Sequence, residues 1–311
     1  MNNLLPETRT LIAVADFFGL PNTDVVAKDF HVVQAIKALA TLDATPFTLV
    51  FGGGTALARA HKLIERMSED VDFKIVPSSL TTSRSALRKQ LGTLRESVTE
   101  ALQKAGFIFD ANDPNHLRSR NEHHYNIYHI PYEYQAPQKQ ELRATLQIEL
   151  TYATLRCPTT TLPVASFVAD AFQSEAEVPT VSCVSVNETA AEKIVSITRR
   201  TAAELAGVNR DVDPTLVRHI YDLHVIREHI DHATVTNLAH VVAEEDAVVF
   251  KNQYPEYQEN IIGETRKAIA ALQADPVFKD RYQRFVAAMV YGQKPTYEEA
   301  LATLIALAEK L

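Results

Sequence analysis

The sequence contains only two cysteines, Cys157 and Cys183, in 311 residues. They form no CxxC pair and are too few for a disulfide framework or a cysteine-rich metal site. The N-terminus lacks the basic residues and apolar run of a signal peptide, and no stretch of about 18 uncharged apolar residues could span a membrane. These absences argue against a disulfide-rich secreted fold and predict a soluble, cytoplasmic protein with no membrane partner.

An excess of positive charge is also absent. The chain carries 31 Lys and Arg against 39 Asp and Glu, a formal net charge of −8. This balance argues against a protein coated in basic surface, although a local basic groove remains compatible with it. Residues 1–160 hold 17 basic and 17 acidic residues, whereas residues 161–311 hold 14 and 22. A polyanion is therefore expected to approach the first half more easily.

The remaining composition is that of an ordinary globular chain, with 46% hydrophobic and 23% charged residues. A chain of this length usually forms about two domains. Prolines 158, 163 and 179 interrupt regular patterns between residues 157 and 185, so the boundary is expected there. We divide the chain into a domain of residues 1–165, with a helical lead-in, and a mainly helical domain of residues 166–311.

Hydrophobic periodicity separates helices from strands along the chain. In the first half it predicts helices over Pro6–Phe18, Asp24–Leu42, Ala56–Arg66 and Thr82–Lys104. Apolar and alternating segments predict strands over Phe47–Phe51, Val71–Val76, Glu122–Tyr134 and Leu142–Leu150. After Asn187, an expected helix cap, it predicts helices over Glu188–Ala206, Pro214–His229, Thr234–Ala243, Gln258–Gln273 and Pro295–Leu311. The pattern indicates an α/β first half followed by a helical second half.

A glycine-rich turn and two aspartates are the most informative feature of the first half. Residues 52–55, Gly-Gly-Gly-Thr, follow a predicted strand and open a predicted helix. Such a turn lets backbone N–H groups approach the oxygens of a triphosphate, and the Thr55 hydroxyl adds a donor. Asp70 and Asp72 lie two apart on the next strand, so both point to the same face and can hold divalent cations through oxygen ligands. Two such ions would activate an attacking hydroxyl and neutralise a leaving pyrophosphate.

Glu149 is the candidate third carboxylate. The segment Leu142–Leu150 alternates strictly, which places Glu149 on the polar face of its strand. A charged residue on a solvated strand face is common, so surface exposure alone would also explain it.

These motifs resemble the DNA polymerase β-like nucleotidyltransferase superfamily, which has a Gly-Gly-Ser/Thr turn followed by Asp-x-Asp. They resemble more closely the AbiEii/AbiGii toxin family of type IV toxin–antitoxin and abortive phage systems, which includes the MenT-like toxins. The family pattern Gly-Gly-Thr-x-Leu matches residues 53–57, and Arg-Phe-Ser-Glu-Asp-Ile-Asp-Leu is similar to residues 66–73. The resemblance implies a mixed-sheet domain followed by a helical domain that completes the cleft. It implies nucleotide contacts by Gly53, Gly54, Thr55, Arg66 and Ser68.

Later blocks of the family pattern add two candidates from the second half. Residues 191–193 match its Ala-Glu-Lys helix, and residues 218–223 match Arg-Asp-Leu-Tyr-Asp-Leu except that His219 replaces the first Asp. The resemblance implies that Lys193 binds the nucleotide phosphates and that Asp222 orients either Lys193 or the base of the nucleotide. An ordinary ion pair between two helices is the alternative for both.

Other clusters have less specific interpretations. Arg59, Lys62 and Arg66 would share one face of the predicted helix, either as solvated surface or as phosphate contacts. Adjacent His123 and His124 would point to opposite faces of a strand, which is poor geometry for a metal. The aromatic residues of the second half are expected in the helix core: Tyr254, Tyr257, Phe278, Tyr282 and Phe285.

The resemblance implies a metal-dependent nucleotidyltransferase toxin that uses Mg²⁺ or Mn²⁺. It would transfer a nucleoside monophosphate from a nucleoside triphosphate to RNA, at the 3′ end of tRNA, and so block translation and growth. It also implies a cognate antitoxin protein as partner. Two alternatives remain open at this point. A compact acidic pocket would favour transfer to a small cationic antibiotic, and a lapsed active site would leave a scaffold that binds a nucleotide or a partner.

Overall fold

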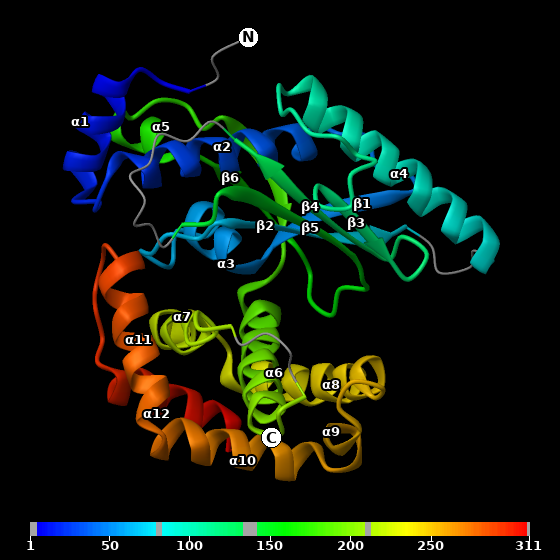
Figure 1. Cartoon of the computed structure of the whole chain (residues 1–311), viewed down its shortest axis with the longest axis vertical. Helices are drawn as coiled ribbons and strands as arrows, with labels where there is room; N and C mark the ends of the chain where they lie inside the picture. Colours follow the sequence, from blue (N-terminus) through cyan, green and yellow to red (C-terminus); the bar gives the residue numbers. More distant parts are fainter. Residues whose placement is uncertain (1–4, 79–82, 133–141, 209–212, 310–311) are drawn as a thin grey trace. The chain divides into compact units, whose positions relative to one another are not determined.

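The structure is a computed structural model that describes residues 5–78, 83–132, 142–208 and 213–309. The chain divides into two compact units (Figure 1). The first comprises Met1–Lys62 and Arg66–Val184, and the second comprises Leu63–Glu65 and Ser185–Leu311. The segment 166–184 belongs to the first unit, because its strand pairs there with the strand that precedes the glycine turn.

The first unit is built on a mixed sheet, which confirms the α/β prediction. Its described residues form seven strands in the order β3-β4-β5-β2-β1-β7-β6. The strands are β1 Phe47–Gly52, β2 Asp70–Pro77, β3 Leu117–Arg120, β4 Tyr125–Pro131, β5 Thr145–Tyr152, β6 Thr160–Val164 and β7 Val178–Cys183. β2 pairs with β5 and β1 with β7 in parallel, and the other neighbours are antiparallel.

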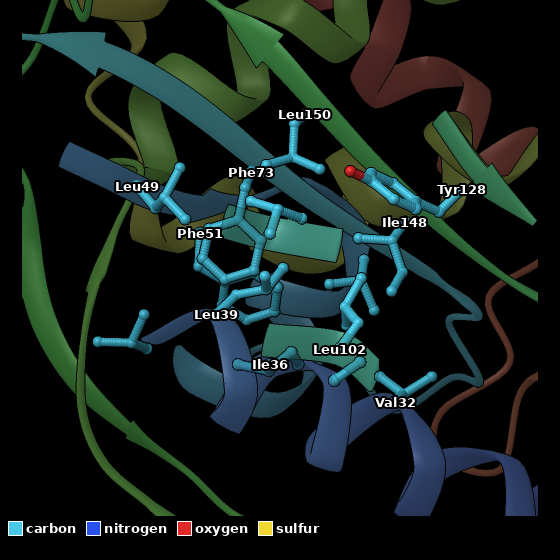
Figure 2. Packing of buried hydrophobic residues seen from close by; sticks show 14 of the residues in the cluster. Val32, Ile36, Leu39, Leu49, Phe51, Phe73, Leu102, Tyr128, Ile148 and Leu150 are labelled. Carbon is cyan, nitrogen blue, oxygen red and sulfur yellow. The ribbon is translucent and has the colours of Figure 1, made fainter. Parts of the chain in front are cut away.

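Helices α2 and α4 cover one face of this sheet and form its hydrophobic core (Figure 1). The helices of the unit are α1 Thr8–Phe18, α2 Thr23–Ala40, α3 Gly53–Thr55, a π-helical turn Ala56–Ala60, α4 Arg84–Lys104 and α5 Phe167–Ala171. Figure 2 shows side chains of α2 and α4 against alternate residues of the strands: Val32, Ile36, Leu39, Leu49, Phe51, Phe73, Leu102, Tyr128, Ile148 and Leu150. Because strand residues alternate between faces, their neighbours in sequence lie on the opposite face of the sheet.

The second unit is a helical assembly around α6, which packs against α7, α8 and α10. Its described elements are α6 Val186–Leu205, α7 Arg218–Ile226, a 3₁₀ turn Arg227–His229, α8 His232–Phe250, α9 Pro255–Glu259, α10 Ile261–Ala274, α11 Pro276–Met289 and α12 Tyr297–Ala308. The five aromatic residues expected in the helix core are all buried. Backbone N–H groups of Tyr291 and Gly292 each donate to the carbonyl of Glu65 at 3.1 Å, which joins the segment 63–65 to this unit.

Several element boundaries differ from the prediction. The helix after the glycine turn ends at Ala60 instead of Arg66, because Lys62 adopts a positive φ of 54° and the chain turns away. Helix α6 begins after Ser185, whose hydroxyl accepts the N–H of Asn187, so Asn187 is not the cap. Strand β4 begins at Tyr125, and the predicted residues 133 and 134 lie outside the described part.

Within the described residues, none of the individual helices is long and apolar enough to cross a membrane. The pair α1 and α2 passes this test jointly, with a bend of 102°, by length and composition alone.

Candidate functional site

The glycine turn brings β1 against the second aspartate. β1 ends at Gly52, and Gly53 follows with a positive φ of 71°, a backbone conformation in which a residue with a side chain is strained. A Cβ atom at Gly53 would lie 1.9 Å from Oδ2 of Asp72. The position therefore requires glycine for two reasons, backbone conformation and the space that the Asp72 carboxylate occupies.

Thr55 supports the first aspartate from the same turn. Its side chain is buried, and its hydroxyl donates to the backbone carbonyl of Asp70 and lies 3.0 Å from the Ser68 hydroxyl. The hydroxyl of Thr55 has one proton, and donating it to the Asp70 carbonyl fixes the start of β2. The role of Thr55 seen here is to position Asp70, and a direct contact with phosphate stays a prediction.

Arg66 and Ser68 converge on the next glycine of the turn. A Cβ atom at Gly54 would lie 2.6 Å from Nη2 of Arg66 and 2.9 Å from Oγ of Ser68. Arg66 is only 3% exposed, and its Nη1 donates to the carbonyl of Met67 at 2.9 Å. The structure therefore brings together the glycine turn and the two side chains that the family motif assigns to the nucleotide.

The three predicted carboxylates lie on one face of the sheet. In the pairing of β2 with β5, Asp72 lies opposite Glu149 and Asp70 lies opposite Gln147. Val71 and Phe73 are buried in the core, so the aspartates between them occupy the other face. Gly52 lies opposite Asp72 on the remaining side, which places the turn, Asp72 and Glu149 in one cross-strand row.

Glu149 lies in an environment that disfavours its charge. Burial raises the pKa of Glu149, and the negative charge of Asp70 raises it further. Two hydrogen bonds oppose this shift, one donated by Gln147 Nε2 at 2.5 Å and one by the Tyr125 hydroxyl. Tyr125 on β4 is an addition to the predicted set, and burial together with Glu149 raises the pKa of its hydroxyl.

Arg143 is a second residue of this site that sequence reasoning did not assign. Its Nη1 donates to Oδ1 of Asp70 and, at 3.0 Å, to Oε1 of Gln147. The main chain of Arg143 is held as well, since its N–H donates to Glu69 at 2.8 Å and its carbonyl accepts from Lys28 at 2.6 Å. Lys28 is buried and ion-paired with Glu69. The guanidinium of Arg143 is therefore hydrogen-bonded to Asp70, one of the predicted metal ligands.

The donor set is suited to a hard divalent cation. Asp70, Asp72 and Glu149 supply oxygen ligands only, which Mg²⁺ and Mn²⁺ prefer. Burial raises the pKa of Glu149, the charge of Asp70 raises it further, and the guanidinium of Arg143 is ion-paired with Asp70, so positive charge is favoured on this face of the sheet. As these side chains stand, no group of three His, Cys, Asp or Glu side chains within the described ranges forms a ready metal cage. Metal binding by these three carboxylates would therefore require their side chains to rearrange.

The two candidates of the second unit form an ion pair. Nζ of Lys193 on α6 lies 2.8 Å from Oδ2 of Asp222 on α7, and the side chains are 6% and 0% exposed. The structural alternative for these residues is therefore realised, and a role in nucleotide binding stays a prediction. His219, which replaces the family Asp, lies with Nε2 3.4 Å from the Ser196 hydroxyl.

The three basic residues expected on one helix face are separated in the structure. Arg59 is buried, with Nε 2.6 Å from Asp29, whereas Lys62 pairs with Asp170 at 2.8 Å. Arg66 lies beyond the helix. The expectation of a shared face was wrong because the helix ends before the second residue of the three.

Two comparisons with known proteins gave matches. The model of the family described as nucleotidyl transferase AbiEii toxin, type IV TA system, matches residues 37–303. The solved structure of MenT4, nucleotidyltransferase toxin Rv2826c from Mycobacterium tuberculosis H37Rv, is similar with a TM-score of 0.56 and 17% sequence identity. The match covers 97% of this chain and 90% of that one, and at this identity it shows the fold alone. The search of curated proteins found no match.

Proposed function

Because this chain belongs to the AbiEii family of nucleotidyltransferase toxins of type IV toxin–antitoxin systems, we propose that its acceptor is RNA, at the 3′ end of tRNA. The reaction would join a nucleoside monophosphate from a nucleoside triphosphate to the terminal hydroxyl, with pyrophosphate as the leaving group. A modified 3′ end blocks aminoacylation, and growth stops. A cognate antitoxin would oppose the enzyme in the cytoplasm, where its RNA substrate resides.

One observation carries the catalytic part of the proposal. The glycine turn, Asp72 and Glu149 lie in one cross-strand row, with Asp70 on the same face. In this arrangement a triphosphate held at the turn would have its reacting phosphorus beside the carboxylates. Mg²⁺ or Mn²⁺ held by these oxygens would supply charge neutralisation for the leaving pyrophosphate and a more acidic attacking hydroxyl.

The chain's own groups have separate tasks in this proposal. The backbone at Gly53 and Gly54 approaches the phosphates closely, because neither residue has a Cβ atom in the way. Arg66 adds positive charge at the same turn, and Ser68 a hydroxyl. The Tyr125 hydroxyl and Gln147 orient Glu149 by donating to it.

The second unit contributes Lys193 and Asp222 to the proposal through the family motif alone. Lys193 would bind nucleotide phosphate, and Asp222 would hold the ammonium in place through the ion pair described above.

A label-transfer assay tests the acceptor and the nucleotide together. The purified chain is incubated with total RNA, Mg²⁺ and each of the four α-labelled triphosphates in separate reactions. We expect the label of one or more triphosphates in the tRNA fraction, at a terminus sensitive to periodate blocking of the 3′ end. Label in another RNA would correct the acceptor. Absence of label in RNA, together with label in an aminoglycoside added to a parallel reaction, would replace the proposal with antibiotic transfer.

A further inference from the structure

The edge strand of the sheet carries two arginines on the same face as the three carboxylates. On β3, Arg118 pairs with Ile127 and Arg120 with Tyr125 of β4. The intervening residue of β3 pairs with Asn126, which is buried on the core side. Strand alternation therefore places Arg118 and Arg120 on the face opposite the core, and both are exposed.

The pairing registers connect these arginines to the site. Ile127, the partner of Arg118, pairs with Glu149 of β5, and Glu149 pairs with Asp72 of β2. The row that begins at the glycine turn thus continues past the carboxylates and ends at Arg118. Neighbouring strands lie about 4.8 Å apart, so the backbones of Arg118 and Asp72 are separated by about 14 Å. About four stacked nucleotides span this length, at 3.4 Å each.

Electrostatic effects on two intervening residues agree with this placement. Burial raises the pKa of the Tyr125 hydroxyl, Glu149 raises it further, and Arg120 opposes them. Burial lowers the pKa of His129 on the same strand, and the charge of Arg118 lowers it further. The two guanidinium groups therefore act on the polar face of the sheet.

Both arginines retain free donors. Arg118 donates through Nε to the carbonyl of Pro114 at 2.9 Å, which leaves its terminal nitrogens available. Arg120 has no ion-pair partner among the residues that the structure describes. By contrast, Lys104 on α4 is paired with Glu100.

We propose that Arg118 and Arg120 bind the phosphodiester backbone of the acceptor RNA and guide its 3′ end across β4 to the carboxylates. The order along the row supports this assignment. The triphosphate is placed at the glycine turn on one side of Asp72, so the acceptor must approach from the other side, where the arginines lie. Arginine suits this task because its planar guanidinium donates to phosphate oxygens in pairs. The inference rests on the proposed RNA acceptor.

The test compares RNA binding by two double variants in an Asp72→Asn background, which prevents turnover. One replaces the arginines, Arg118→Ala with Arg120→Ala. The control, Lys89→Ala with Lys104→Ala, removes two exposed charges from α4 on the core-facing side of the sheet. Filter binding of labelled tRNA is measured over a range of salt concentrations, and triphosphate binding is measured by calorimetry.

We expect the arginine variant to bind tRNA at least tenfold more weakly. We also expect its slope of log K against log salt to be shallower by about 1.4, since each arginine contact with single-stranded RNA contributes about 0.7. The control should change tRNA affinity by less than twofold, and triphosphate affinity should be equal in both. A charge-preserving variant, Arg118→Lys with Arg120→Lys, should recover part of the tRNA binding, because lysine keeps the charge and loses the paired donation.

Equal tRNA binding by the arginine variant and the control would overturn this inference while the proposed function stands. Weakened triphosphate binding in the arginine variant would also overturn it, because the substitutions would then disturb the site as a whole. If the Asp72→Asn parent binds no RNA and the wild-type chain labels none, the proposed RNA acceptor fails as well.

Discussion

Gly53 must be glycine both for its backbone conformation and for the position of the Asp72 carboxylate. Its φ is positive, and a Cβ atom would lie 1.9 Å from Asp72 Oδ2. We expect Gly53→Ala to displace the Asp72 carboxylate and to reduce nucleotidyl transfer at least tenfold. The loss would be measured as initial rate of label transfer, with folding checked by circular dichroism.

Gly19 provides a matched control for this prediction. It also has a positive φ, 63°, but no atom lies within 4 Å of its Cβ position. Gly19→Ala therefore introduces a similar backbone strain, about 1–2 kcal/mol, without a collision. If the two variants lose activity equally, strain alone explains the effect and Gly53 has no special relation to Asp72.

Arg143 is ion-paired with Asp70, one of the carboxylates proposed to hold the cation. Arg143→Ala should therefore tighten binding of Mn²⁺ alone several-fold, because the ion no longer competes with the guanidinium for the carboxylate. Calorimetric titration of the chain without nucleotide measures this affinity. Weaker Mn²⁺ binding in the variant would show that Arg143 orders the ligands and does not compete with the ion.

The residues of the site were predictable to the extent that strand alternation determines them. The spacing of Asp70 and Asp72 places both on one face, and the alternating pattern around Glu149 correctly gives its polar side. The contact of Arg143 with Asp70 joins residues 73 positions apart, and no local pattern encodes such a pairing. The buried hydroxyl of Thr55 was likewise beyond reach, because its acceptor is a backbone carbonyl on another element.

At the scale of elements, the ion pair between α6 and α7 bears on the stability of the fold and, in the proposed function, on nucleotide binding. Lys193 and Asp222 are almost fully buried, so removal of either leaves an uncompensated charge that costs about 3–5 kcal/mol. We expect Lys193→Ala and Asp222→Ala each to lower the free energy of unfolding by about 3 kcal/mol. The double variant should lose less than the sum of the two.

The same variants separate structure from nucleotide binding. If Lys193 binds phosphate, Lys193→Ala should also weaken triphosphate binding at least tenfold, since a charge-assisted contact is worth about 1.5–3 kcal/mol. Calorimetry on folded protein below the melting temperature measures this affinity. Unchanged affinity with reduced stability would remove Lys193 from the nucleotide site and leave the carboxylate assignment intact.

Helix α2 contains a buried histidine that makes stability depend on pH. Burial lowers the pKa of His31 from its ordinary 6.5 to about 4, and neither ring nitrogen has a hydrogen-bond partner in the described ranges. The unfolded chain therefore binds a proton that the folded chain does not, and stability falls as pH decreases from about 6.5 to 4. The difference between the two pKa values lowers the free energy of unfolding by about 3 kcal/mol at pH 4.

His31→Phe should remove this part of the pH dependence, because the ring packs near Phe107 and Tyr132 and a neutral aromatic side chain suits that environment. Urea unfolding at pH 7 and pH 4.5 measures the difference for variant and parent. An identical loss of stability in both proteins would mean that His31 is protonated in the folded state without cost.

The predicted elements differ from the observed ones where tertiary pairing decides the outcome. The short strands β6 and β7 lie in a proline-interrupted segment, and pairing with β1 and with each other stabilises them. Helix α11 begins at Pro276 and was not predicted, although proline at the first helical position is a common start. The early end at Ala60 depends on the positive φ of Lys62, which its residue type does not indicate.

For the whole molecule, chain length predicted two domains, and hydrophobic periodicity predicted an α/β part before a helical one. The uneven charge, neutral to residue 160 and acidic after it, favours the proposed polyanion site in the first unit. Composition could not locate the basic edge at β3, because the order of strands in the sheet brings Arg118 into a row with Asp72.

The most direct test of the central claim compares nucleotidyl transfer by the wild-type chain and by Asp72→Asn in the presence of Mg²⁺. The substitution keeps the shape of the side chain and removes only its charge, on a face of the sheet that does not contribute to the core. We expect label transfer to RNA to fall by at least a thousandfold while the melting temperature stays within a few degrees, and we expect excess chelator to abolish transfer by the wild-type chain. A folded Asp72→Asn protein with full activity, or undiminished transfer in excess chelator, would contradict the assignment of these carboxylates to metal-dependent transfer.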